Sequence, residues 1–94
     1  MNTAKIDSLG QKMGTDALRT LVQLFPEVRD AKDDDVTLAR VAMRAKAKDV
    51  IDELFDAIEK APGLEAQAYA TAILTIAHEG IKILREAACR STMN

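Results

Sequence analysis

The chain has 94 residues, of which 48% are apolar and 30% are charged, and its formal net charge is −2. A chain of this length holds a single core, so the composition predicts one helical domain over residues 1–94 and excludes a second domain or a disordered segment. Thirteen basic against fifteen acidic side chains exclude the strongly basic surface of a general nucleic-acid or acidic-membrane binder.

The cysteine count and the apolar runs bear on the cellular setting. The one cysteine, Cys89, excludes an internal disulfide framework and favours a reducing compartment. The longest stretch without charged side chains, 66–78, is shorter than the roughly 20 apolar residues that a membrane span needs. No leader-like segment opens the chain. We therefore expect a cytoplasmic protein that does not bind membranes.

The first part of the chain predicts two short helices. Apolar residues recur at helical spacing and show no sustained alternation, which is typical of an all-α fold. Thr3 can cap the first helix, and Gly14 followed by Thr15 provides a stop signal and a new N-cap for the second. Pro26 ends the second helix, since a proline disfavours helical backbone at the residue before it.

The rest of the chain predicts two long helices. In the acidic segment 27–35, one of the last three aspartates should cap a helix over 36–61. Pro62 and Gly63 break the chain before a second helix over 64–90. Each helix spans roughly 40 Å, and a two-residue break folds them back on each other. We therefore predict an all-α small helical bundle, with two long antiparallel helices forming a hairpin plus one or two short N-terminal helices.

The last helix is apolar over an arc of about 200°, whereas a helix that packs on one side of a core shows a stripe of roughly 100°. We therefore expect it to have neighbours on two sides. The centre of the arc comprises Tyr69, Ala72, Ile73, Ile76, Ala77, Gly80, Ile83, Leu84 and Ala87. The polar remainder, which we assign to solvent, comprises Gln67, Thr71, Thr75, His78, Lys82 and Arg85. Two short helices cannot cover such a hairpin along its length, so apolar surface should remain for a second copy or a partner.

Charge is segregated along the first long helix. Residues 36–48 include four bases and no acid, whereas residues 49–59 include five acids and no base. Like charges four residues apart destabilise a helix by a few tenths of a kcal/mol per pair. Two interpretations stay open. Antiparallel pairing with a second copy would bring the basic half against the acidic half, or the charges lie on a solvated surface without a partner.

The apolar residues of this helix also suggest a binding surface. Over 47–58 they form a regular stripe that we assign to the core, but this stripe projected toward the N-terminus meets Arg40 and Arg44. Leu38 and Val41 form a separate stripe with a charged rim, as interfaces do. The candidate partner-binding residues are Leu38, Arg40, Val41, Arg44 and Lys48. The alternatives are arginines that snorkel from a partly buried face, or packing of the N-terminal helices there.

The sequence contains no recognisable catalytic, cofactor or metal motif. His78 is the only histidine and lies on the polar arc, where we expect it in solvent, and Cys89 is expected to be a small packing residue. A calcium loop counted from Asp33 would need glycine and glutamate where Leu38 and Arg44 stand. We therefore expect no enzyme, no metal and no cofactor.

The alternative function is a small DNA-binding transcriptional regulator that uses the basic first half of the 36–61 helix. Arg40, Arg44 and Lys48 repeat every four residues and could follow a row of phosphates. The aspartates at the start of that helix oppose this interpretation, because the corresponding end of a helix-turn-helix recognition helix contacts bases. The long loop before the helix is also atypical of that motif.

Asp52-Glu53-Leu54-Phe55, within the hairpin of two long helices, resembles the TraM family of quorum-sensing antiactivators, whose members are helical and bind a transcription activator. The resemblance covers one helical turn and the general architecture, and it assigns no family. It implies that a small acidic helical protein can act by occupying another protein's surface. The leading hypothesis is a non-enzymatic helical interaction module, a homodimer through its long hairpin, that regulates or inhibits a protein partner.

Overall fold

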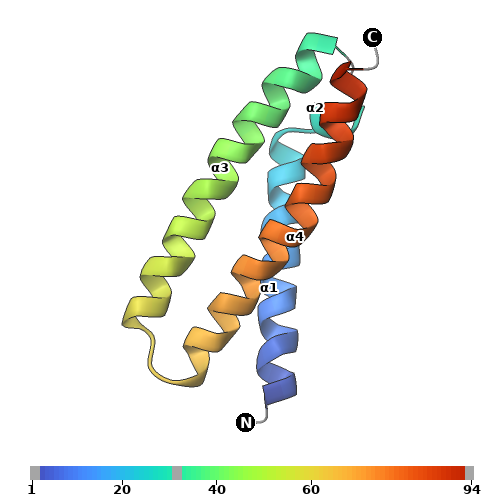
Figure 1. Ribbon diagram of the computed structural model, residues 1–94. Helices are drawn as coiled ribbons and strands as arrows, with labels where there is room; N and C mark the ends of the chain where they lie inside the picture. The colour runs from blue at the N-terminus through green and yellow to red at the C-terminus, as the bar shows by residue number, and fades with distance from the viewer. Residues whose placement is uncertain (1–2, 31–32, 93–94) are drawn as a thin grey trace.

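The computed structural model describes residues 3–30 and 33–92 of the chain, and all of its regular elements are helices. They are α1 (Thr3–Leu24), α2 (Glu27–Asp30), α3 (Asp33–Lys60) and α4 (Leu64–Thr92), shown in Figure 1. The prediction of an all-α bundle is confirmed. None of the helices in these two ranges combines the length and the apolar character needed to cross a bilayer.

The α3–α4 hairpin is antiparallel, as the sequence predicts (Figure 1). The turn falls at residues 61–63, where Gly63 has a φ of 55°, a left-handed conformation that glycine adopts without steric cost. With 28 and 29 residues, the two helices each exceed 40 Å at 1.5 Å per residue. The hairpin therefore determines the elongated shape of the molecule, which measures 50 × 22 × 18 Å.

α1 is one continuous helix of 22 residues, so the predicted break at Gly14 and Thr15 is wrong. Gly10 and Gly14 face α4. A Cβ atom at Gly10 would lie 2.6 Å from the Cβ of Thr71, and one at Gly14 would lie 2.7 Å from the Cβ of Thr75. Real side chains do not approach so closely. The two glycines therefore allow the backbones of α1 and α4 to pack at short range, and tertiary packing accounts for a residue that locally resembles a helix stop.

The packing of α1 also corrects the assignment of the whole polar arc of α4 to solvent. Gln67, Thr71 and Thr75 are half-buried. The Asp7 carboxylate of α1 accepts hydrogen bonds from Gln67 Nε2 at 3.2 Å and from Thr71 Oγ1 at 3.4 Å. The members of the arc that are exposed, as expected, are His78, Lys82 and Arg85. With α3 on the other flank, α4 has the two neighbours that its wide apolar arc predicts.

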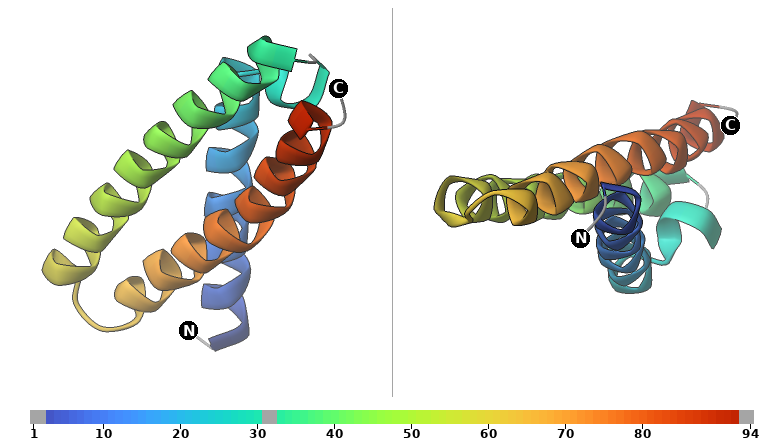
Figure 2. Two further views of the ribbon diagram at one scale, coloured as in Figure 1. Left: turned by 45° about the horizontal axis from the view of Figure 1, so that its top comes forward. Right: turned by 90° about the horizontal axis from the view of Figure 1, so that it is seen from below.

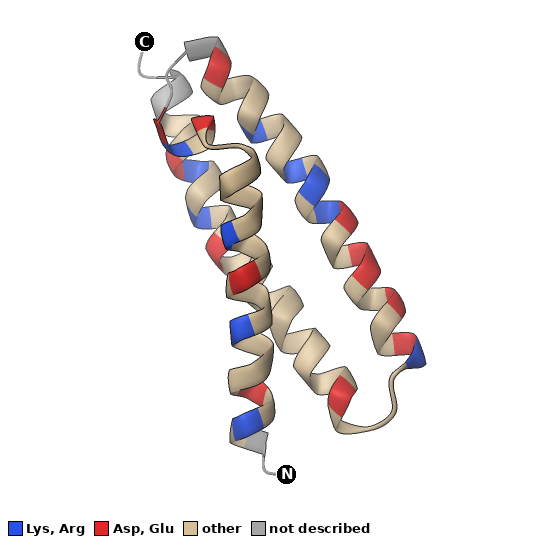
Figure 3. Ribbon diagram, turned by 180° about the vertical axis from the view of Figure 1, so that it is seen from behind, with Lys and Arg blue, Asp and Glu red and all other residues tan. Residues whose placement is uncertain are grey.

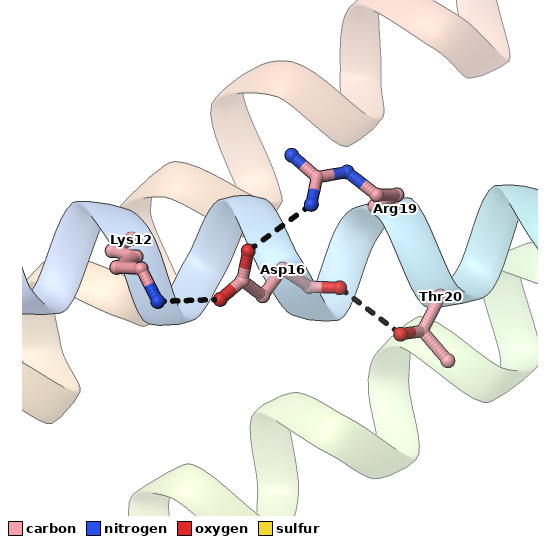
Figure 4. Close-up of polar contacts among 4 residues, drawn as sticks. All are labelled: Lys12, Asp16, Arg19 and Thr20. Carbon is pink, nitrogen blue, oxygen red and sulfur yellow. Dashed lines mark hydrogen bonds and ion pairs between the residues drawn. The ribbon is translucent and has the colours of Figure 1, made fainter.

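The exposed side of α1 carries a local polar network (Figure 4). The Asp16 carboxylate lies 3.4 Å from Lys12 Nζ and 3.5 Å from Arg19 Nη1, and the Thr20 hydroxyl donates a hydrogen bond to the Asp16 carbonyl. Exposed ion pairs of this kind contribute at most about 1 kcal/mol each. The position of α1 is therefore determined by its packing on α4.

The core lies at the end of the bundle where all four helices meet. The segment after Pro26, predicted as a polar connection, contains the one-turn helix α2, whose Val28 is fully buried. The main buried cluster comprises Leu18, Leu21, Val28, Val36, Ala39, Met43, Ile83 and Ala87. α3 begins at Asp33, so the aspartates occupy its first turn. Thr3, Asp33 and Asp34 were candidates for helix caps. Their side chains are not among those that the structure describes.

On α3, buried residues do not extend to the turn end of the hairpin, whereas Ala68 and Ala72 of α4 and Ile6 of α1 are buried. The sequence predicted two separate apolar stripes on the two halves of α3. The structure instead shows one continuous stripe facing the other helices, which comprises Val36, Ala39, Met43, Ala47, Val50 and Leu54. Its first three members are buried, but from Ala47 to Lys60 every residue is half-buried or exposed, and Phe55 is 53% exposed. The predicted core stripe over 47–58 is therefore only partly covered by its own chain.

Candidate interaction surface

α1 and α2 both lie on one side of the α3–α4 hairpin, and the opposite side carries no helix (Figure 2, right). At 100° per residue, the helical positions on this side fall on two neighbouring stripes, one on each long helix. We call this surface the open face. Its residues are Val41, Arg44, Lys48 and Phe55 of α3 and Leu74, Ala77, Ile81 and Arg85 of α4.

Large apolar side chains of the open face are in contact with water. Leu74 is 69% exposed, Val41 is 60% exposed and Ile81 is 54% exposed. The total accessible surface is 6286 Å², whereas a compact 10.2 kDa monomer exposes about 5,300 Å². The radius of gyration is 14.8 Å against about 12.4 Å for a compact domain of this length. The chain thus leaves more surface uncovered than its size requires.

A groove of about 370 Å³ runs between α3 and α4 at one end of the open face. Its residues are Arg40, Val41, Arg44, Ile81, Leu84, Arg85 and Ala88. Four of them are apolar and three are arginines, so the groove combines an apolar lining with concentrated positive charge. Such a lining can bury apolar side chains of a bound helix while it holds that helix's carboxylates, since guanidinium groups bind carboxylates in a bidentate manner.

Arg40 stands out within the groove. The residue is half-buried, and its Nε atom is buried without a hydrogen-bond partner in the described part of the chain. A buried donor left unsatisfied destabilises a structure by about 1–3 kcal/mol. Among the side chains that the structure describes, those of residues 4–30 and 35–89, no carboxylate lies within ion-pair distance of Arg40, Arg44 or Arg85. The groove therefore holds positive charge that none of these described side chains neutralises.

The structure brings together three of the five residues that the sequence singled out. Arg40, Val41 and Arg44 line the groove. Leu38 is 70% exposed, but it lies on the outer side of α3, beyond the groove lining. Lys48 lies one turn further along α3, and its ammonium is 3.3 Å from Asp52 Oδ2, an ion pair at the boundary between the basic and the acidic half.

The segregation of charge on α3 is visible as a basic half followed by an acidic half (Figure 3). The side chains of the acidic half are all exposed, and they are Asp49, Asp52, Glu53, Asp56 and Glu59. Of these, Asp52 is the one for which the described residues provide an ion pair. The repulsion within each half is therefore not relieved by the rest of the described chain.

A second, wider groove of about 1020 Å³ is lined by residues of both α1 and α4, such as Thr15, His78 and Lys82. The imidazole of His78 is 72% exposed, as expected. Within the described ranges, no three His, Cys, Asp or Glu side chains are grouped to hold a metal ion. Cys89 is exposed, which corrects its expected packing role. The charges of this groove have both signs and do not converge on one point.

The α4 half of the groove was not anticipated from the sequence. Ile81, Leu84 and Arg85 contribute to it, although the sequence pattern of α3 pointed only to α3 residues. The antiparallel hairpin itself carries the missing signal, because residues whose numbers add up to about 125 lie side by side, such as Val41 with Leu84.

Comparison of the chain with protein-family models, with curated proteins and with solved structures gives no match.

Proposed function

We propose that this protein is a non-enzymatic helical interaction module that associates with a second copy through its long hairpin and regulates or inhibits a partner protein. The observation that carries the proposal is the uncovered half of α3, in which no residue from Ala47 to Lys60 is fully buried. Complete burial of one large apolar side chain stabilises an association by about 1.5–3 kcal/mol. Several half-exposed side chains on one face therefore provide a strong tendency to associate.

The arginine-lined groove supports a role in partner recognition. Interfaces combine an apolar centre, which contributes most of the affinity, with charges that set orientation and the rate of capture. In this protein Val41 would contribute apolar contacts inside the groove and Leu38 would contribute them beyond it on the outer side of α3, while Arg40 and Arg44 would select acidic side chains. Lys48 would add positive charge at the edge of the same surface.

Affinity capture from a lysate of the native cell tests the role in partner binding. The comparison is between the unchanged protein and the variant with Arg40→Glu and Arg44→Glu, with Lys12→Glu on α1 as the control. We expect a partner that is retained by the unchanged protein and by the control but not by the groove variant. Circular dichroism must show equal helicity for all three. Equal retention of the same proteins by all three would rule out this surface as the binding site.

DNA binding is the second candidate, because Arg44 and Lys48 are exposed on successive turns of α3. Two features weigh against it. The Lys48 ammonium is already paired with Asp52, and the half-buried Arg40 lines the groove. A duplex probe whose mobility shift weakens as salt increases, and disappears in the variant with Arg40→Glu and Arg44→Glu, would support the DNA-binding role.

A further inference from the structure

We infer that two copies pack their open faces together about a two-fold axis perpendicular to the long helices. In this arrangement α3 lies antiparallel on α3 of the second copy, α4 lies antiparallel on the second α4, and the axis passes near Lys48 and Ala77. The inference rests on the proposed self-association. It adds the face, the direction and the register of the two copies.

Lys48 and Ala77 lie at the same level of the hairpin. Lys48 precedes the end of α3 by 12 residues and Ala77 follows the start of α4 by 13, so both lie about 18–20 Å from the turn. The groove shows the same register, since it joins Arg44 of α3 with Ile81 of α4. One axis can therefore pass close to both residues.

Two pairs of opposite charges on α3 are arranged symmetrically about Lys48. Arg44 and Asp52 lie four residues before and after it, and Arg40 and Asp56 lie eight residues before and after it. The two-fold axis places each of these two arginines at the level of an acid of the second copy, whereas parallel pairing would place acid beside acid. At the axis, each Lys48 is accompanied by its own Asp52 at 3.3 Å, which limits repulsion between the two ammonium groups.

The exposed apolar residues follow the same symmetry. Val41 and Phe55 lie seven residues on either side of Lys48, so the axis brings Val41 of each copy opposite Phe55 of the other. On α4 the small Ala77 lies at the axis and allows close approach, while Leu74 and Ile81 lie three and four residues away on either side. Each large side chain thus meets an apolar side chain of the other copy.

The available area is sufficient for a stable dimer. A face about 40 Å long, on a molecule 22 Å across, offers roughly 800 Å² per copy, the size of a standard specific interface. A two-fold arrangement uses the same surface on both copies and closes without further growth. The second copy would also cover the arginine groove, so a partner that binds the same arginines would compete with dimer formation.

A charge exchange at one predicted pair tests the register. Arg44→Glu and Asp52→Arg each place like charges opposite one another, and each should raise the dimer dissociation constant by about tenfold or more. Combining both substitutions restores opposite charges and should return the constant toward its original value. Lys12→Glu is the control, because it makes the same kind of charge reversal at an exposed position of α1, on the other side of the hairpin. Failure of the double variant to recover would contradict the register.

Disulfide cross-linking provides a second measurement, in a Cys89→Ser background. Lys48→Cys and Ala77→Cys should each cross-link to themselves, because positions near the axis meet their own counterparts within the reach of a disulfide. Val41→Cys and Phe55→Cys, about 20 Å from their own counterparts, should cross-link only when mixed with each other. A protein that stays monomeric at all concentrations would disprove the proposed self-association. A dimer that gives none of these cross-links would disprove only the arrangement.

Discussion

At the scale of single residues, the two glycines of α1 show how a local signal acquires its meaning from a distant partner. Gly10 and Gly14 are spaced by one turn and lie against the small residues of α4, where a Cβ atom has no room. The sequence of α1 alone suggests a helix stop at Gly14, because glycine is common after a helix. In the structure α1 continues through Gly14, and the lack of a side chain there allows α4 to pack closely against it. The role of Gly14 becomes apparent only from this contact with α4.

Gly14→Ala should lower the free energy of unfolding by about 1–3 kcal/mol, because the new methyl group would lie 2.7 Å from Thr75 Cβ and 2.8 Å from the Ala72 carbonyl oxygen. Gly80→Ala is the control, since its Cβ would meet Leu18 Cδ1 at 3.7 Å, an ordinary contact. That control should be neutral or more stable, as alanine favours helix. Urea denaturation measures both. Equal stability of the two variants would contradict the close packing of α1 on α4.

Arg40 is the residue at which burial and charge conflict. Replacing Arg40 by methionine removes the buried, unpartnered Nε while it keeps most of the side-chain volume. The free energy of unfolding of the monomer should therefore stay constant or rise, by at most about 1–3 kcal/mol. Arg44→Met, at an exposed position, should change it by less than about 0.5 kcal/mol. A clear loss of stability in the Arg40→Met variant would show that the guanidinium contributes to the monomer fold.

At the scale of the helices, the sequence predicted the parts that depend on local signals. The two long helices and their antiparallel order follow from continuous helical spacing and from Pro62 with Gly63. The one-turn helix α2 was missed because a buried Val28 among polar neighbours has no periodic pattern around it. The burial of Thr71 under α1 was missed because a threonine on a polar arc looks solvated until a second helix covers it.

α3 should behave as two halves in hydrogen exchange. Its first half contributes the buried Val36 and Met43, whereas residues 48–60 contain no fully buried side chain. Local opening is easiest where few apolar contacts are buried. At low concentration the amides of 48–60 should therefore exchange faster than those of 36–47, and the difference should shrink as the concentration rises. Uniform exchange along α3 at every concentration would contradict this account.

At the scale of the whole molecule, the sequence pointed to the surface but not to its extent. The apolar and basic residues of α3 were recognised, because both patterns lie within one helix. The α4 side of the groove depends on the pairing of Ile81 and Leu84 with residues about 40 positions earlier. That pairing follows from the register of the hairpin, which is a property of the folded chain. The direction that we propose for self-association likewise depends on both helices being placed at one level.

The central claim is that the long hairpin exposes more apolar surface than its own chain covers, so that a second copy must cover it. The most direct test is the molar mass in solution as a function of concentration, measured by sedimentation equilibrium. We expect twice the protomer mass of 10.2 kDa at high micromolar concentration, with a decline toward 10.2 kDa on dilution. A mass of 10.2 kDa that does not change over the whole concentration range, for a fully helical protein, would contradict the claim.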